Sequence, residues 1–206
     1  MQTIKLTTII LSILSIGFSC KAQDNLKTVN DAKGLEVGQV VENFTATDVN
    51  GNIFSLDKGL ENGPVVLIFI RGQWCPVCNR HMNTIQDSLK YIQEKGAQVV
   101  VVSPEKPEFI EKTIEKSKIE FTVLYDEGQR ISDYFDVTFN PDGKTKMIYN
   151  TVLGAKLKES HTDDSERLPI PATFIIGQDK KIVWRQFDVD YKNRSTVKDI
   201  IENIPQ

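Results

Sequence analysis

The chain has 206 residues, of which 40% are hydrophobic, and its formal net charge is -3 at pH 7. This composition is that of an ordinary globular protein, and the length fits one domain with short additions. The slight acidic excess gives no reason to expect nucleic acid as a partner. Beyond the N-terminus, no apolar run is long enough to cross a bilayer.

The first twenty residues are typical of a secretory signal. Lys5 provides a positive start, an apolar stretch runs from Ile9 to Phe18, and small residues surround Cys20. A cysteine at this position resembles the lipobox of bacterial lipoproteins, in which the acylated cysteine becomes the mature N-terminus. We expect residues 1–20 to be a lipoprotein-type signal peptide and Cys20 to be lipidated. The protein would then lie in the cell envelope or periplasm, anchored to the membrane. Simple cleavage near Ala22-Gln23 is the alternative.

The next segments predict a tether and the start of a domain. Residues 21–34 are polar and predict a flexible tether, and the domain itself is expected over residues 35–206. Two extended runs flank Asn50-Gly51 and predict a β-hairpin, because both turn residues tolerate positive φ. The apolar, β-branched run from Val65 to Ile70 predicts a buried central strand.

Two cysteines with two residues between them follow this strand. Arg71-Gly72 breaks the strand, and Pro76 opens a segment with helical periodicity. Proline suits the first helical position, because the N–H that it lacks would have no partner there. The free N–H groups at a helix start favour a thiolate and lower its pKa. Since a thiolate attacks disulfides and peroxides, Cys75 and Cys78 form the predicted chemical centre.

The number of cysteines supports this interpretation. If Cys20 carries lipid, the three cysteines leave one pair, Cys75 and Cys78. A structural zinc site usually needs four ligands, and the chain has only one C-x-x-C motif and two histidines. A pair this close in sequence closes a very short loop and stabilises a fold poorly. We therefore expect a redox-active pair, no metal and no bound cofactor.

The remaining elements predict an α/β domain. Apolar residues three or four apart predict one helix from Cys78 to a cap at Gly96. The later elements are a strand at 97–102, a helix from Pro107, a strand at 121–124, a short helix at 129–135, an inserted loop region at 140–167 with one small helix or hairpin, a hairpin of 172–176 with 181–185, and a final helix near 197–204. This order predicts a central mixed β-sheet with helices on both faces.

Four motifs resemble the AhpC/TSA family (alkyl hydroperoxide reductase/thiol-specific antioxidant), the peroxiredoxin-like branch of the thioredoxin fold. They are Val37-Gly38 with Asn43-Phe44-Thr45 and Asn50-Gly51, the RGxWCPxCN run Arg71–Asn79, the LPIPATF run Leu168–Phe174, and the DYxxR run Asp190–Arg194. Together they span roughly residues 35 to 206. The resemblance implies a thioredoxin-like fold and a thiol-dependent antioxidant activity.

The resemblance also implies roles for residues around the pair. Pro171 matches the proline that thioredoxin-fold proteins hold in cis against the active cysteines. Trp74, next to Cys75-Pro76, is expected to cover one face of the pair. Arg71 or Arg194 could supply the positive charge that activates the thiolate, and a salt bridge at the surface is the alternative for Arg71.

Two possible alignments assign the attacking role to different cysteines. Against typical peroxiredoxins, Cys78 falls on the peroxidatic position, and Cys75 replaces a threonine that helps to hold the peroxide. Against thioredoxins, Cys75 is the exposed nucleophile and Cys78 the resolving thiol. In the second case the buried carboxylate of thioredoxins is missing, because Phe69 stands in its place.

Three other polar features carry weaker expectations. A protonated His81, one turn after Cys78, could lower a thiolate pKa, and a solvated side chain is the commoner outcome. His161 lies in a polar stretch that predicts a surface loop, with folding over the site as the alternative. The charged run from Glu105 to Lys118 predicts a solvated helix face.

These residues predict an exported thiol oxidoreductase that reduces peroxides. One thiolate of the pair would become a sulfenic acid, the other cysteine would condense with it to a disulfide, and an external dithiol would reset the pair. The first alternative is a thiol–disulfide reductase that attacks protein disulfides through Cys75. The second is a non-enzymatic, lipid-anchored domain with a structural or redox-switched disulfide. The presence of Trp74, Pro76 and Pro171 around the pair argues against the second.

Overall fold

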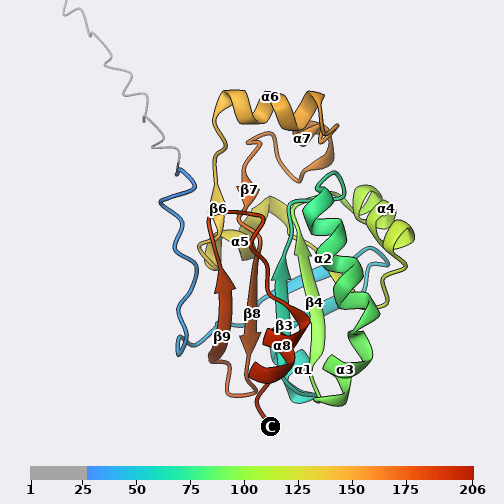
Figure 1. The fold of residues 1–206 in the computed structure, drawn as a ribbon, viewed down its shortest axis with the longest axis vertical. Helices are drawn as coiled ribbons and strands as arrows, with labels where there is room; N and C mark the ends of the chain where they lie inside the picture. The colour runs from blue at the N-terminus through green and yellow to red at the C-terminus, as the bar shows by residue number, and fades with distance from the viewer. Residues whose placement is uncertain (1–26) are drawn as a thin grey trace, which may run out of the picture.

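The computed structural model describes residues 27–206 (Figure 1). Its centre is a seven-stranded sheet with the order β2-β1-β5-β4-β3-β8-β9. The strands are β1 (Thr45–Asp48), β2 (Ile53–Ser55), β3 (Val65–Phe69), β4 (Gln98–Ser103), β5 (Thr122–Tyr125), β8 (Ala172–Ile176) and β9 (Ile182–Phe187). The predicted mixed sheet and its N-terminal hairpin, β1–β2, are confirmed.

Strand β3 lies in the middle of the sheet and leads directly into the C-x-x-C motif. It runs parallel to β4 and antiparallel to β8, with Val66 opposite both Val99 and Ile175. All five of its residues are buried, because helices cover both faces of the sheet. This explains why the sequence there is continuously apolar rather than alternating.

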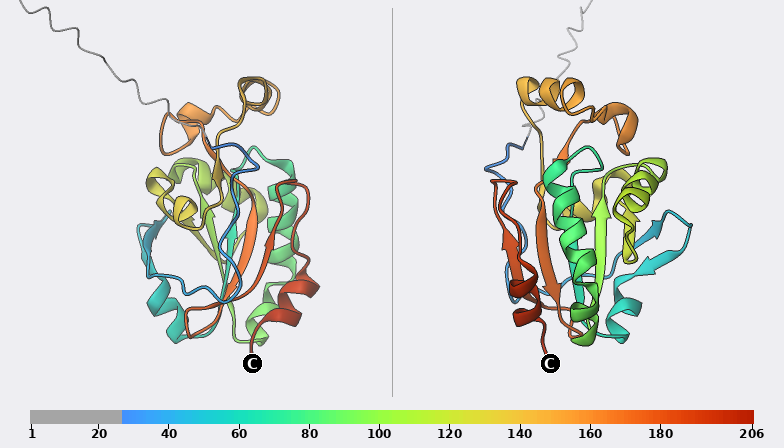
Figure 2. Two further views of the ribbon diagram at one scale, coloured as in Figure 1. Left: turned by 90° about the vertical axis from the view of Figure 1, so that its left-hand side faces the viewer. Right: turned by 45° about the vertical axis from the view of Figure 1, so that its right-hand side comes forward.

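Two layers of helices enclose the sheet (Figure 2). Helices α2 (Pro76–Asp87), α3 (Leu89–Glu94), α4 (Pro107–Ser117) and α8 (Val197–Asn203) pack on the face that carries Val66 and Ile68. Helices α1 (Leu56–Glu61) and α5 (Arg130–Tyr134) pack on the face that carries Val65 and Leu67, and a short 3-10 turn, η1 (Glu127–Gln129), precedes α5. The sheet therefore holds the end of β3 between two hydrophobic cores.

One predicted helix is two helices in the structure. The segment after Cys78 breaks at Ser88, whose φ of -113° and ψ of 6° are not helical, and α3 begins at the next residue. Serine competes for backbone hydrogen bonds and favours helix ends over helix interiors. The apolar spacing continues across the break, since Ile85 and Leu89 are both buried in the same core. Periodicity alone therefore does not reveal the break.

The inserted region is more ordered than the sequence predicts. Strands β6 (Thr138–Phe139) and β7 (Leu168–Pro169) pair antiparallel, and helices α6 (Gly143–Thr151) and α7 (Leu157–Ser160) lie between them in the chain. Both helices sit beyond the end of the central sheet where α2 begins (Figure 1). Helix α6 has no buried residue, so it has no apolar stripe that sequence periodicity could detect.

The described N-terminal segment lies along the domain. The Asn140 N–H donates to the Lys27 carbonyl (2.7 Å), the Gly34 N–H donates to the Asp136 carbonyl (3.1 Å), and Ala32 is buried. Residues 27–34 are thus fixed on the domain, unlike the free tether predicted for them, because these backbone groups find partners there. The predicted signal peptide, with Cys20, and residues 21–26 lie outside the described residues. Within residues 27–206, no helix has the length and apolarity needed to cross a membrane.

Candidate active site

Helix α2 begins at the cysteine pair. Cys75 is its N-cap residue and Pro76 occupies its first turn, as the sequence predicts. The Cys75 backbone is extended (φ -87°, ψ 105°), and its Sγ accepts a hydrogen bond from the Cys78 N–H at 3.3 Å. The sulfur therefore takes the place of a capping oxygen, where the free N–H groups of the helix favour negative charge.

The pKa values of the two thiols are shifted in opposite directions. Both thiols are free and fully buried, and Cys78 Sγ donates to Cys75 Sγ at 2.6 Å. This hydrogen bond, together with the charge of Arg71, lowers the pKa of Cys75 to about 5 although burial acts against it. Burial and the neighbouring Cys75 raise the pKa of Cys78 well above its ordinary value. At neutral pH the pair is thus a Cys75 thiolate beside a Cys78 thiol.

Arg71 provides the positive charge at the attacking sulfur. Its side chain is only 2% exposed, and Nη2 donates to Cys75 Sγ at 3.2 Å. Nη1 donates to the Tyr149 hydroxyl at 3.0 Å. Burial lowers the pKa of Arg71, but the negative charge of the Cys75 thiolate raises it above its ordinary value, so the guanidinium stays charged. The alternative of a salt bridge at the surface is wrong, because the side chain is buried against the sulfur.

Three aromatic rings hold this guanidinium. Its central carbon lies 3.9 Å from the ring centre of Tyr191, 5.1 Å from that of Trp74 and 5.2 Å from that of Tyr149. Aromatic faces attract a cation, most strongly where water is excluded. Trp74 is buried in the same core cluster as both cysteines and packs on Tyr149 with ring centres 5.0 Å apart. The tyrosines thus fix the direction of Arg71. Sequence reasoning missed Tyr149 and gave Tyr191 no role beyond its place in the DYxxR motif.

Glu105 is a second group that the sequence did not reveal. It follows β4 and is fully buried, and its Oε2 accepts the Gln73 N–H at 2.7 Å. A Cβ atom added at Gly72 would lie 2.5 Å from Glu105 Oε1, so the turn before Cys75 packs directly on the carboxyl group. The predicted solvated helix face is wrong at this residue, because Glu105 precedes α4. Its place directly after β4 could have indicated that Glu105 lies near the cysteine pair. Strands β3 and β4 are parallel, so their carboxyl ends meet at one edge of the sheet.

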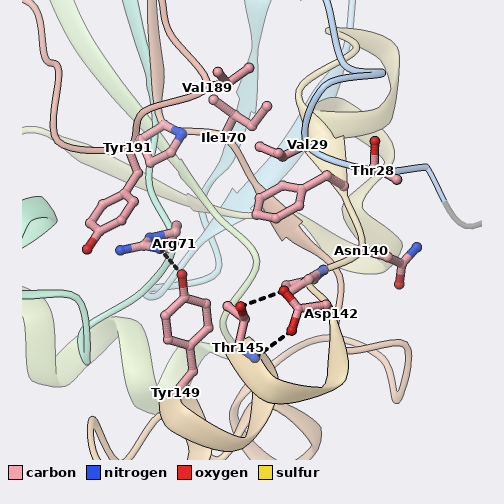
Figure 3. A pocket seen from close by; sticks show the side chains of 13 residues that line it. Thr28, Val29, Arg71, Asn140, Asp142, Thr145, Tyr149, Ile170, Val189 and Tyr191 are labelled. Carbon is pink, nitrogen blue, oxygen red and sulfur yellow. Dashed lines mark hydrogen bonds between the residues drawn. The ribbon is translucent and has the colours of Figure 1, made fainter.

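A pocket of about 550 Å³ opens beside Arg71 (Figure 3). Its walls are largely apolar and come from the N-terminal segment, α6, the β7–β8 connection and the loop after β9. They include Val29, Phe139, Tyr149, Ile170, Val189 and Tyr191. Tyr149 and Tyr191 stand on two sides of the guanidinium in this view. The size and lining are those of a site for a small, partly apolar molecule.

The sequence of this chain is similar to those of known thiol enzymes. The AhpC/TSA family model matches residues 37–185. The chain belongs to the AhpC/TSA family. A chloroplastic peroxiredoxin Q from Populus jackii is 27% identical over 168 residues, 75% of this chain and 76% of that protein. The thiol-disulfide oxidoreductase ResA of Bacillus thuringiensis (strain Al Hakam) is 26% identical over 137 residues, 63% of this chain and 76% of that protein. These matches make this AhpC/TSA chain an enzyme of the thiol peroxidase or thiol–disulfide oxidoreductase kind.

Solved structures agree with the fold. The peroxidoxin BcpB of Mycobacterium tuberculosis superposes with a TM-score of 0.63 at 20% identity, over 82% of this chain and 96% of that one. A putative protein disulfide isomerase from Bacteroides thetaiotaomicron superposes with a TM-score of 0.56 at 16% identity, over 83% and 90%. The predicted thioredoxin-like architecture of this AhpC/TSA protein is therefore confirmed.

Two further predicted residues lie near the pair. Arg194, from the DYxxR motif of the AhpC/TSA resemblance, places Nη2 3.5 Å from Cys78 Sγ. Pro171 lines the pocket beside Arg71. The prediction of a cis bond before Pro171 is wrong, since residues 27–206 contain no cis peptide. The Ile170–Pro171 bond is trans, the form that X-Pro bonds ordinarily prefer.

Both histidines of this AhpC/TSA chain differ from expectation. His81 is buried and its Nε2 lies 3.1 Å from the Ser195 carbonyl oxygen. Burial and the nearby Arg194 lower the pKa of His81 to about 4, so it is neutral at pH 7 and supplies no charge to a thiolate. His161 is also buried, not on a surface loop, and forms a β-bridge with Glu105. Burial lowers its pKa to about 4 as well. Among residues 27–206, no cluster of three potential metal ligands occurs.

Proposed function

We propose that this AhpC/TSA enzyme reduces peroxides, with Cys75 as the attacking thiolate and Cys78 as the resolving thiol. The observation that carries the proposal is the contact of 3.2 Å between Arg71 Nη2 and Cys75 Sγ. A guanidinium at this position stabilises the thiolate before the reaction. It can also stabilise the negative charge that develops on the leaving oxygen during the attack.

The proposed reaction balances with the groups at the site. The Cys75 thiolate attacks one peroxide oxygen, and two electrons pass from the sulfur into the O–O bond, which breaks. Cys75 becomes a sulfenic acid, and the departing hydroxide or alkoxide takes up one proton. The Cys78 thiol then attacks the Cys75 sulfur and water leaves, which forms the disulfide. An external dithiol returns the pair to two thiols and is itself oxidised to a disulfide.

Burial of the sulfur favours a small oxidant. Cys75 has no exposed surface, so a disulfide on another protein could reach it only if the site opened. The pocket beside Arg71, by contrast, leads to the guanidinium that binds the sulfur. A peroxide that enters this pocket would meet Arg71 first and the thiolate next.

The second candidate function is reduction of disulfides. It is favoured by the order of the pair: the acidic cysteine is the first of the C-x-x-C motif, at the helix N-cap, with the second thiol 2.6 Å away. Disulfide exchange uses this arrangement. The first cysteine forms a mixed disulfide with the substrate, and the second cysteine then attacks that disulfide and releases the reduced substrate. The similarity to ResA adds support to this candidate.

The proposed location is the cell envelope. The N-terminal pattern that ends at Cys20 supports export and lipidation of that cysteine, and so attachment to the membrane. We expect incorporation of a labelled fatty acid into the wild-type chain but not into Cys20→Ala. A wild-type chain that takes up no label would contradict lipidation while leaving the proposed chemistry untouched.

Stopped-flow oxidation of the reduced enzyme tests the activity. Hydrogen peroxide is mixed with wild type, Cys75→Ser and Cys78→Ser, and the tryptophan fluorescence, to which Trp74 beside the pair contributes, is followed. We expect fast oxidation in wild type and in Cys78→Ser, which should stop at a sulfenic acid, and none in Cys75→Ser. Fast oxidation that needs Cys78 but not Cys75 would reverse the two roles. Oxidation no faster than that of a free thiol, with ready reduction of a protein disulfide through Cys75, would favour the second candidate.

A further inference from the structure

The space behind the active-site turn contains a buried carboxyl group that the proposed reaction does not use. Glu105 is 0% exposed, as is Cys75. One of its oxygens, Oε2, accepts the Gln73 N–H, while the other, Oε1, has no hydrogen-bond partner. A buried carboxylate with an unpartnered oxygen is costly, whereas a carboxylic acid in the same place avoids the cost of a buried charge.

The turn 72–74 connects this carboxyl group to the attacking cysteine. Gln73 donates its N–H to Glu105, and the next contact along the turn is the Cys75 N–H, which donates to the Gly72 carbonyl at 3.1 Å. Gly72 has a φ of 138°, which only glycine adopts readily, and its Cα faces the carboxyl group closely enough to exclude a side chain. Movement of Glu105 would therefore be transmitted to the backbone that positions Cys75.

The charges around Glu105 do not neutralise it. The groups that face it are Gln73 from the turn, Lys112 from α4, Cys75 from the start of α2, and His161 across its β-bridge. Lys112 is exposed, with its ammonium group over the Phe109 ring, and His161 is neutral at pH 7. Arg71, the buried cation, is committed to Cys75 and Tyr149. Two negative charges in this enclosed region would repel each other, so their protonation is coupled.

We propose that Glu105 is a positioning residue that keeps its proton while Cys75 is a thiolate and loses it more readily once Cys75 is neutral. In the reduced enzyme the negative charge of this region lies on sulfur, and the carboxyl group ionises at a lower pH once that charge is gone. Burial raises the pKa of Glu105 to about 8, and the negative charge of Cys75 contributes in the same direction. Loss of that charge on oxidation lowers the pKa of Glu105 again.

The inference rests on the proposed role of Cys75. It adds Glu105 to the proton balance of the first step. When the thiolate becomes a sulfenic acid, the leaving alkoxide takes up one proton from the surroundings. Any proton that Glu105 releases when its pKa falls offsets part of that uptake. When the external dithiol later restores the Cys75 thiolate, Glu105 takes up a proton again.

Alkylation of Cys75 by iodoacetamide tests the coupling without any peroxide. The rate is measured from pH 4 to pH 10 on the reduced full chain, with the modified residue identified by mass spectrometry. In wild type we expect a first rise near pH 5 and a second near pH 8, as ionised Glu105 makes the thiolate more basic. The second rise should be about threefold for each unit by which the pKa of Cys75 increases. Glu105→Gln should lack it, and Glu108→Gln, an exposed acid in the first turn of α4, should retain it.

An infrared difference spectrum gives a second readout that needs no stable variant. The wild-type protein is compared after reduction and after oxidation by diamide at pH 7. We expect a carbonyl band of a protonated carboxyl group in the reduced protein that weakens on oxidation. Absence of this band in the reduced protein, or an unchanged second rise in a folded Glu105→Gln, would overturn the proposal. Because neither experiment uses peroxide, a failed peroxidase assay would leave both results interpretable.

Discussion

Arg71 Nη2 and Cys75 Sγ lie 3.2 Å apart, although the two residues lie near the ends of different elements. Arg71 lies two residues after the last residue of the central strand β3, and Cys75 caps helix α2. The turn between them brings the buried guanidinium back over the sulfur. The acidity of Cys75 therefore depends on a strand end, a helix start and the aromatic rings that hold Arg71 in place.

Loss of this guanidinium should raise the pKa of Cys75. We expect Arg71→Met to raise it by at least about one unit, because the thiolate loses a charge-assisted hydrogen bond of roughly 1.5–3 kcal/mol. The thiolate absorbance is followed as a function of pH in the reduced protein. Arg80→Met, which removes an exposed arginine from α2, is the matched control and should behave as wild type. An unchanged titration in a folded Arg71→Met would show that the helix N-terminus and Cys78 suffice.

The pH profile should separate Cys75 from an ordinary cysteine. Its lowered pKa of about 5 keeps the thiolate fully formed above pH 6, and the thiolate is lost as pH falls through 5. We expect alkylation by iodoacetamide to be constant between pH 6 and pH 7, then to fall toward tenfold per pH unit below pH 5. A rate that still climbs tenfold from pH 6 to pH 7 would be that of a free thiol with a pKa near about 8.5 and would support the non-enzymatic alternative.

The hydroxyl group of Tyr149 should matter through Arg71. Tyr149→Phe keeps the ring beside the guanidinium but removes the acceptor at 3.0 Å. We expect the pKa of Cys75 to rise by less than in Arg71→Met, because the ion pair with sulfur remains. The same absorbance titration measures this shift. Tyr91→Phe, an exposed position on α3, provides the control. A shift as large as that of Arg71→Met would mean that the hydroxyl group alone orients the guanidinium.

Gly72 should tolerate no side chain. In Gly72→Ala the new Cβ atom would lie 2.5 Å from Glu105 Oε1, on a backbone with a φ of 138°. We expect a loss of at least about 2 kcal/mol in the free energy of unfolding, from strain and overpacking together. Urea denaturation measures it. Gly143→Ala, at the start of α6 with no neighbour within 4 Å, should be neutral or slightly stabilising. Equal stability of the two variants would contradict the packing of the turn on Glu105.

The pocket should distinguish large peroxides from small ones. Thr145 lines it from α6, and Thr145→Trp would fill much of its volume (Figure 3). We expect a drop of about tenfold or more in kcat/KM for cumene hydroperoxide, a loss of at least about 1.4 kcal/mol, and a smaller effect for hydrogen peroxide. Thr151→Trp places the same ring on an exposed position of the same helix as a control. An equal loss for both peroxides would place the entry of substrate elsewhere.

Much of this fold follows from local patterns in the chain. The apolar run of β3, the Asn50-Gly51 hairpin and the helix that Pro76 opens all depend on residues adjacent in sequence. Dihedral preferences and one-sided burial act over a few residues, so they can be inferred without a structure. The C-x-x-C motif likewise identifies the reactive pair, since the distance between its sulfurs is set by one helical turn.

The environment of the pair depended on contacts between distant segments. Tyr149 reaches Arg71 from 78 positions away, and Gln73 meets Glu105 across 32 positions. No local sequence pattern predicts such a contact, because each of these residues could equally lie on the protein surface. The sequence by itself therefore determined the architecture and the two sulfurs. Only the tertiary structure decided which sulfur carries the charge, because desolvation and charge are set by everything that packs around a group, whatever its place in the chain.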